Sequence, residues 1–483
     1  MAKGSIKKNT IYNMIKVVSQ IIFPLITFPY ISRVLHADAV GTVNYANSIY
    51  SYISLIASLS ITTYAVRECS IFRENRNELG KTASELFTIN LYATFIAYAV
   101  MLVVLCIPKF QSIQSIIVIY CVNMIFTTLG ADWINTAMED FRYITFRTVS
   151  FQIISLILMF IFVHKPDDYV KYVIISVIAS SGSNITNIFY RRKYCRIKLV
   201  RNPNISKHLP PILKFFVSVI TQQIYVNSDI VMLGWITNTT QVGLYSTASK
   251  IFNIINMMIA SIFTVVLPQA CSSYETGDYK RYNEILRKVI LFLIGLGLPC
   301  AVGMFFLSKE VIILIAGAEY ASASPALKIF AVALLFSYIH GFLGNLLAIP
   351  MGDFNIGIVA AIISSLTNIV LNAILIPRYG FVAAALTTMI AELISALIFS
   401  KKINKNIHIT HVGKPLVHSI IGCIFISIFI LLMKKTMIIS FVNIIMMILG
   451  SVLIYGIVLL IFKDEFFMQG LNLVIGRVKR ENR

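Results

Sequence analysis

Long apolar runs separated by short polar breaks make up almost the whole chain. A helix needs about 20 apolar residues to cross a bilayer, so this pattern predicts about fourteen membrane-spanning helices. The predicted spans are residues 11–32, 40–66, 83–107, 112–135, 142–163, 167–190, 212–236, 241–268, 286–306, 325–350, 355–376, 380–400, 415–433 and 437–462. The fold class that follows is an all-α, polytopic membrane protein, with no break long enough to hold a catalytic domain.

Composition agrees with this fold class and disfavours others. Of the 483 residues, 58% are hydrophobic and 13% are charged, whereas a soluble domain has about 45–50% apolar and about 25% charged residues. A soluble enzyme, a secreted disulfide scaffold and a disordered chain do not fit these values. The seven cysteines follow no regular spacing, and Gly80-Lys81-Thr82 lacks the glycine that a phosphate-binding loop would have at position 75. We expect no metal site and no cofactor.

The formal net charge of +20 indicates how the chain crosses the membrane. With the N-terminus inside, the inner breaks hold roughly four times as many Lys and Arg as the outer ones, and these residues gather in cytoplasmic loops. An even number of spans places both termini on one side, so we expect both in the cytoplasm. The break at 191–211 is basic and has no acid, which favours a cytoplasmic linker near anionic lipid.

A weak internal repeat relates the two halves of the chain. When the chain is shifted by 202 residues, Val40-Gly41 aligns with Val242-Gly243, and Ser19-Gln20 aligns with Thr221-Gln222. The alignment pairs the first six spans with the next six, so both copies enter the membrane from the same side and the repeat is parallel. We predict two six-helix lobes, a linker and two extra helices, at residues 1–190 (N-lobe), 191–211 (linker), 212–400 (C-lobe) and 401–483 (extra helices and cytoplasmic tail).

Three charged residues lie deep within predicted spans. A charge near the bilayer centre costs at least about 2.5–3.5 kcal/mol, so it usually faces a cavity or a partner. Lys250 and Glu392 fall near the middle of their spans, and Asp229 falls in the outer third of its own. We interpret all three as facing a polar lumen, with structural ion pairing as the alternative.

Polar side chains accompany these charges at helical spacing. They are Lys16 and Gln20 on the first span, Ser51, Ser58 and Thr62 on the second, Gln222 on the seventh and Asn253 on the eighth. Close packing between helices is the alternative for the small hydroxyl residues. His340 either couples transport to protons or is a packing histidine. Pro24 and Pro29 give the first span either a hinge or a static bend.

Three stretches carry a resemblance to a known family. They are Asp132-Trp133 through Glu139 with Arg142-Tyr143-Ile144-Thr145, then Val242 through Ile251, then Asn368 through Asn372 with Pro377-Arg378-Tyr379-Gly380 and Ala391-Glu392. There, and over nearly the whole chain, the sequence resembles the Wzx-type flippases of lipid-linked polysaccharide repeat units. These flippases belong to the multidrug/oligosaccharidyl-lipid/polysaccharide exporter superfamily. The sequence departs from the family pattern at Asn135-Thr136-Ala137, where relatives carry an aromatic residue, Gln and Gly.

The resemblance implies a transporter, not an enzyme, in the bacterial cytoplasmic (inner) membrane. It would move undecaprenyl-diphosphate-linked oligosaccharide from the inner to the outer leaflet by alternating access, for O-antigen or capsule-type surface polysaccharide. A diphosphate that leaves water needs a cation. The hypothesis therefore assigns substrate binding to Lys250, Lys16, Arg33, Gln20, Gln222 and Asn253, ion coupling or gating to Asp229, Glu392 and His340, and a hinge to Pro24 and Pro29. Membrane lipids, a polysaccharide polymerase and a chain-length regulator are the other partners to consider, and no nucleic acid is expected.

Two other functions stay open at this point. A MATE-like, cation-coupled drug antiporter would favour acidic residues deep in the first lobe, where this sequence has none. A membrane polysaccharide polymerase or glycosyltransferase would favour a large external loop or paired carboxylates, and the outward acid pair is Asp167-Asp168, in a short break. The sequence leaves open the sugar composition, the coupling ion, the oligomeric state and the type of surface glycan.

Overall fold

The computed structural model describes residues 6–401, 410–436 and 440–468, apart from the side chains of residues 6, 7, 218 and 354. The described residues are almost entirely helical and contain no strand, which confirms the predicted all-α class. Helices satisfy every backbone N–H and C=O within one segment, as a span through lipid requires. The chain forms two compact units, Met1–Gly243 and Leu244–Arg483.

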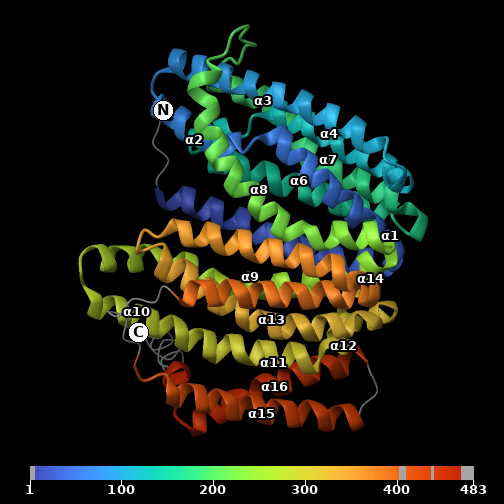
Figure 1. Ribbon diagram of the computed structural model, residues 1–483, viewed down its shortest axis with the longest axis vertical. Coiled ribbons are helices and arrows are strands. Elements are labelled where there is room, and N and C mark those ends of the chain that lie inside the picture. The colour runs from blue at the N-terminus through green and yellow to red at the C-terminus, as the bar shows by residue number, and fades with distance from the viewer. Residues whose placement is uncertain (1–5, 402–409, 437–439, 469–483) are drawn as a thin grey trace, which may run out of the picture. The chain divides into compact units, whose positions relative to one another are not determined.

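The first unit is a bundle in which α1 packs against α3, α4, α6 and α8, and α7 packs against α4 and α6 (Figure 1). Its helices are α1 (Ile6–Ser58), α2 (Ile61–Ile71), α3 (Arg76–Leu105), α4 (Gln114–Gly130), α5 (Trp133–Ala137), α6 (Phe141–Phe162), α7 (Tyr169–Tyr190) and α8 (Ile205–Ile236). Helix α8 begins inside the predicted linker and packs against α1 and α2. The predicted lobes, residues 1–190 and 212–400, were defined by the sequence repeat, and their bounds stay predictions.

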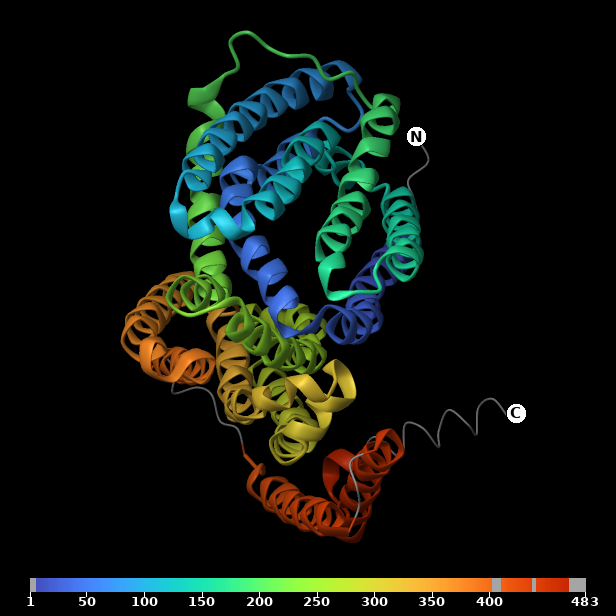
Figure 2. The same ribbon diagram turned by 90° about the vertical axis from the view of Figure 1, so that its right-hand side faces the viewer.

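The second unit is a bundle in which α13 packs against α11 and α14, and α15 and α16 lie side by side (Figure 2). Its helices are α9 (Thr239–Glu275, which starts at the end of the first unit), α10 (Tyr279–Phe292), α11 (Leu298–Phe306), α12 (Ser308–Ala316), α13 (Ser324–Leu343), α14 (Phe354–Ser400), α15 (Gly413–Thr436) and α16 (Phe441–Ile461). The described chain thus continues as packed apolar helices up to the end of α16.

Twelve elements of the described chain are long and apolar enough to cross a membrane. Two of them, Lys8–Ile71 and Asn355–Ser400, have 64 and 46 residues, about twice what one crossing needs. Each contains a residue with non-helical backbone, His36 in the first and Gly380 in the second. Each long element therefore has room for two passes, and the count of fourteen stays a prediction.

The bend at Gly380 folds α14 back on itself. The Asn368 amide donates to the Thr387 hydroxyl (3.3 Å), and that hydroxyl donates to Asn372 (2.6 Å). In a straight helix Asn368 and Thr387 would lie about 28 Å apart. All three side chains are buried, and the two asparagines belong to the sequence motif. They therefore tie the two arms of the helix together.

Helix α1 crosses the start of α9 at two glycines that the sequence repeat aligns. A Cβ at Gly41 would overlap the carbonyl of Thr239, and a Cβ at Gly243 would overlap the carbonyl of Ala37. The shift of 202 residues that aligns Gly41 with Gly243 also aligns Ala37 with Thr239. The contact is therefore reciprocal within the first unit, and the parallel repeat stays a prediction.

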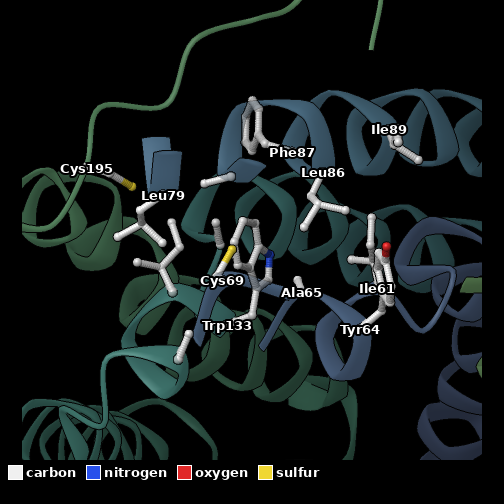
Figure 3. Packing of buried hydrophobic residues seen from close by; sticks show 14 of the residues in the cluster. Ile61, Tyr64, Ala65, Cys69, Leu79, Leu86, Phe87, Ile89, Trp133 and Cys195 are labelled. Carbon is white, nitrogen blue, oxygen red and sulfur yellow. The ribbon is translucent and has the colours of Figure 1, made fainter. Parts of the chain in front are cut away.

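A core of buried side chains from α2, α3 and α5 holds the segment that follows α7 (Figure 3). Cys69, Leu79 and Trp133 belong to this core, together with Cys195 from the basic break. All four side chains are at most 3% exposed. The basic break is thus anchored to the first unit by its apolar residues. Its first cation, Arg191, is also buried, while its other lysines and arginines are exposed.

Helix α1 continues through both of its prolines. Pro24 and Pro29 lie inside the helix, and the non-helical backbone lies further on, at His36. A proline has no N–H, so the carbonyls of Gln20 and Leu25 lose their usual helical donor. The hinge role of the prolines stays a prediction.

Candidate functional site

The predicted binding residues of the first unit lie on two helices, α1 and α8. Lys16 is half-buried on α1. The exposed members are Gln20, Arg33 and Gln222. Asp229, on α8, is 2% exposed and interacts electrostatically with Tyr52 of α1. The buried acid is thus held against the neighbouring helix, while the predicted sugar-binding amides are exposed.

A polar cavity of about 450 Å³ lies within the first unit, among α1 to α5 and α8. Its polar lining residues are Tyr50, Ser51, Ser54, Ser58, Thr62, Asn90, Asn123, Thr127, Thr128, Asp132, Thr136 and Gln223. Ser51, Ser58 and Thr62 come from the stripe that the sequence predicted to face a cavity, whereas Gln223 lines it in place of the predicted Gln222. Hydroxyls and amides in this number can both donate to and accept from sugar hydroxyls.

The acid of this cavity, Asp132, is paired with a buried arginine that sequence reasoning did not single out. Arg147 of α6 donates to Asp132 (2.6 Å), with side-chain exposures of 4% and 37%. The guanidinium also lies over the Tyr143 ring, 5.4 Å from its centroid. The Nε and Nη1 atoms of Arg147 are buried without a hydrogen-bond partner among the described residues. Asp132 therefore provides the counter-charge for an otherwise poorly satisfied cation.

We expect Asp132→Asn to lower the free energy of unfolding by about 2 kcal/mol. Breaking a fully buried pair costs about 3–5 kcal/mol, and the partial exposure of Asp132 reduces this loss. Thermal unfolding of the purified protein in detergent measures it. The matched control is Glu139→Gln, which breaks an exposed pair with Arg73 and should cost no more than about 1 kcal/mol. Equal effects of the two variants would contradict the prediction.

In the second unit, Lys250 lies on α9 at the edge of the buried face. Ser246, one turn earlier, is buried, and Asn253, nearly one turn later, is exposed. Lys250 itself is half-buried. Phe252, two residues later, is buried, and its ring stacks on Phe330. A lysine at such an edge can pack its alkyl stem against apolar neighbours while its ammonium reaches a polar ligand.

The structure brings together two residues that the sequence named separately. His340 of α13 and Glu392 of the second arm of α14 are in hydrogen-bond contact, with Nδ1 3.1 Å from Oε2. Glu392 is 7% exposed and His340 34%, and the His340 ring stacks on Phe399. The arrangement therefore holds a buried carboxylate of one helix in hydrogen-bond contact with a histidine of the next.

A cluster around Asp140, where α6 begins, was missed from the sequence. Its carboxylate accepts hydrogen bonds from the hydroxyls of Tyr190 (2.7 Å) and Tyr194 and from the Tyr143 amide (3.2 Å). Burial alone would raise the pKa of Asp140, but these hydrogen bonds lower it below its ordinary value. The signal in the sequence was the pair of tyrosines one helical turn apart beside the basic break.

Apolar helices with polar and charged groups held inside two bundles define a multi-pass membrane protein with a transporter fold. The chain is similar to the solved structure of the lipid II flippase MurJ in its inward closed conformation, with a TM-score of 0.71 and 19% sequence identity. The match covers 96% of this chain and 100% of that chain. At this identity the likeness concerns the fold.

The chain belongs to the polysaccharide biosynthesis protein family, whose model matches residues 6–273. The MatE family model matches residues 215–374. A putative O-antigen transporter of Shigella dysenteriae is 23% identical over 402 residues, which cover 82% of this chain and 100% of that protein. The capsular polysaccharide biosynthesis protein CapF of Staphylococcus aureus is 28% identical over 262 residues, which cover 52% of this chain and 65% of that protein. The resemblance to polysaccharide flippases is confirmed by these matches.

Proposed function

We propose that this chain is a flippase that moves an undecaprenyl-diphosphate-linked oligosaccharide from the inner to the outer leaflet of the bacterial cytoplasmic membrane by alternating access. The observation that carries the proposal is the combination of a polysaccharide biosynthesis family match with the fold of a lipid II flippase. The relative named as an O-antigen transporter is matched over its whole length. The product would be O-antigen or a capsule-type surface polysaccharide.

The chemistry of the residues fits such a substrate. A diphosphate cannot cross hydrocarbon unshielded, and a lysine or arginine can hold it by charge-assisted hydrogen bonds. Lys250, helped by Lys16 and Arg33, would bind the diphosphate. The sugars would be held by Gln20, Gln222 and Asn253 together with the polar cavity of the first unit. The transporter needs no enzymatic step and no cofactor for this.

Three acid–base residues would connect the cycle to an ion gradient or lock its states. The His340–Glu392 pair would exchange a proton, and Asp229 would serve coupling or gating beside Tyr52. Pro24 and Pro29 would supply a hinge in α1. The positive-inside pattern favours cytoplasmic termini, and a polymerase and a chain-length regulator would act on the product at the outer leaflet.

A MATE-like drug antiporter is the second candidate, since the MatE model matches residues 215–374. The two functions predict different phenotypes. Loss of a flippase should reduce the surface glycan and leave drug susceptibility unchanged. Loss of a drug antiporter should raise drug susceptibility and leave the surface glycan unchanged.

Deleting the gene in its host should abolish the surface polysaccharide and cause lipid-linked oligosaccharide to accumulate. In right-side-out spheroplasts this oligosaccharide should resist a membrane-impermeant reagent that oxidises sugar diols, because it stays in the inner leaflet. A plasmid copy should restore both the surface polysaccharide and the accessibility. Unchanged polysaccharide together with raised drug susceptibility would favour the antiporter and refute the flippase.

A further inference from the structure

The first part of α1 is tied to helix α6 by one hydrogen bond near each end. Near the start of α1 the Thr145 hydroxyl donates to the Tyr12 carbonyl (2.8 Å). At the other end the Tyr30 hydroxyl donates to the Val163 carbonyl (2.7 Å), and the Tyr30 ring packs edge-on against Phe160. About 18 residues of helix separate the two ties along α1, a length of about 27 Å. This is close to the thickness of the bilayer's hydrocarbon core, about 30 Å.

Between these ties the two helices enclose an apolar groove of about 590 Å³. Its walls include Met14, Val18 and Ile22 from α1, and Val149, Ile153 and Leu156 from α6. Met14 and Ile153 are 60% and 53% exposed within the unit. The groove has the length and the lining of a site for a long hydrocarbon chain.

The groove continues into a second hollow of about 810 Å³, with which it shares Ile15, Val149 and Ile153. There the lining turns polar and cationic, because Arg142 and Lys193 line it together with Tyr12 and Tyr143. The apolar groove therefore ends at positive charges close to the tie between Thr145 and Tyr12.

Two cations and one carboxylate line this polar end. Asp140 is the carboxylate, and its oxygens accept from Tyr190 and Tyr194. The Lys193 ammonium lies over the rings of these tyrosines, 5.3 and 5.4 Å from their centroids. Among the described residues no carboxylate forms an ion pair with Arg142 or Lys193. The polar end thus carries one net positive charge.

We propose that this groove binds one phospholipid with a singly charged anionic head group, such as phosphatidylglycerol. An acyl chain would lie between α1 and α6, and the phosphate would lie between Arg142 and Lys193. A single phosphate charge matches the net charge of the hollow, whereas a diphosphate carries at least one charge more. The groove also shares no lining residue with the polar cavity of the first unit. The proposal does not depend on the transported substrate.

Native mass spectrometry of the purified full chain tests the proposal, with phosphatidylglycerol, phosphatidylcholine and undecaprenyl diphosphate titrated separately. We expect one tightly retained phosphatidylglycerol. The double variant Arg142→Gln/Lys193→Gln should weaken its binding by about thirtyfold, the loss expected for two cations at an anionic-lipid site. Val149→Trp should block the groove and abolish retention. Both cations are exposed, and thermal unfolding confirms that each variant is folded.

The matched control is Arg196→Gln/Lys198→Gln, which removes two cations from a different hollow of the same unit. It should leave retention unchanged. Equal retention of phosphatidylcholine, or equal losses in control and test variants, would refute the site. Preferential retention of undecaprenyl diphosphate at Arg142 and Lys193 would assign the groove to the lipid carrier and overturn the proposal.

Discussion

Replacing Lys250 with Met should lower the transport of lipid-linked oligosaccharide by about tenfold or more. Methionine has an unbranched apolar side chain, like the stem of lysine, but it lacks the ammonium. A hydrogen bond to a charged group contributes about 1.5–3 kcal/mol, and about 1.36 kcal/mol corresponds to a factor of ten in rate. The measurement is the rate at which oligosaccharide becomes accessible on the outer leaflet of spheroplasts.

Two further variants separate charge from structure in this experiment. Lys250→Arg keeps the positive charge and should retain most of the transport, although the guanidinium has a different shape. Lys328→Met removes a lysine of α13 whose ammonium lies over the ring of Phe305 in α11. This variant should leave transport unchanged. A wild-type rate in Lys250→Met would remove Lys250 from the proposed diphosphate site without affecting the assignment of the family.

The hydrophobic pattern was sufficient to predict the helices, because lipid leaves few alternatives for a backbone. The predicted break between the first two spans contains His36, the non-helical residue of α1. The predicted break at 377–379 ends one residue before Gly380, where α14 folds back. The hydrophobic pattern could not predict which side chains of different helices, or of the two arms of one helix, contact each other. Asn368 and Thr387 are 19 residues apart in sequence, and only the fold-back makes them neighbours.

The candidate site was accessible from the sequence mainly where a charge lay deep in an apolar span. Such charges are costly, so depth alone singled out Glu392. The depth of a residue in its span could not show that Glu392 contacts His340, because that contact depends on how α13 packs against α14. Arg147 was missed for a related reason. It lies near the start of α6, where an arginine in a sequence is ordinarily read as a surface residue, yet its side chain is buried against Asp132.

The second large expected effect is a loss of stability when either glycine at the crossing of α1 and α9 is replaced. Gly41→Ala should destabilise the protein by about 3 kcal/mol, at the upper end of the cost of overpacking, because the added Cβ would overlap the backbone carbonyl of Thr239. Gly243→Ala should cost a similar amount against Ala37. Thermal unfolding in detergent and the level of surface polysaccharide both report the loss.

The matched control for these variants is Gly303→Ala, also in a helix, where a Cβ meets nothing within 4 Å. Because alanine favours the helical state, it should be neutral or stabilising by about 0.5–1 kcal/mol. The two crossing variants act on one contact, so their combined effect should be smaller than the sum of the single effects. A wild-type melting temperature in either variant would contradict the close backbone approach at this crossing.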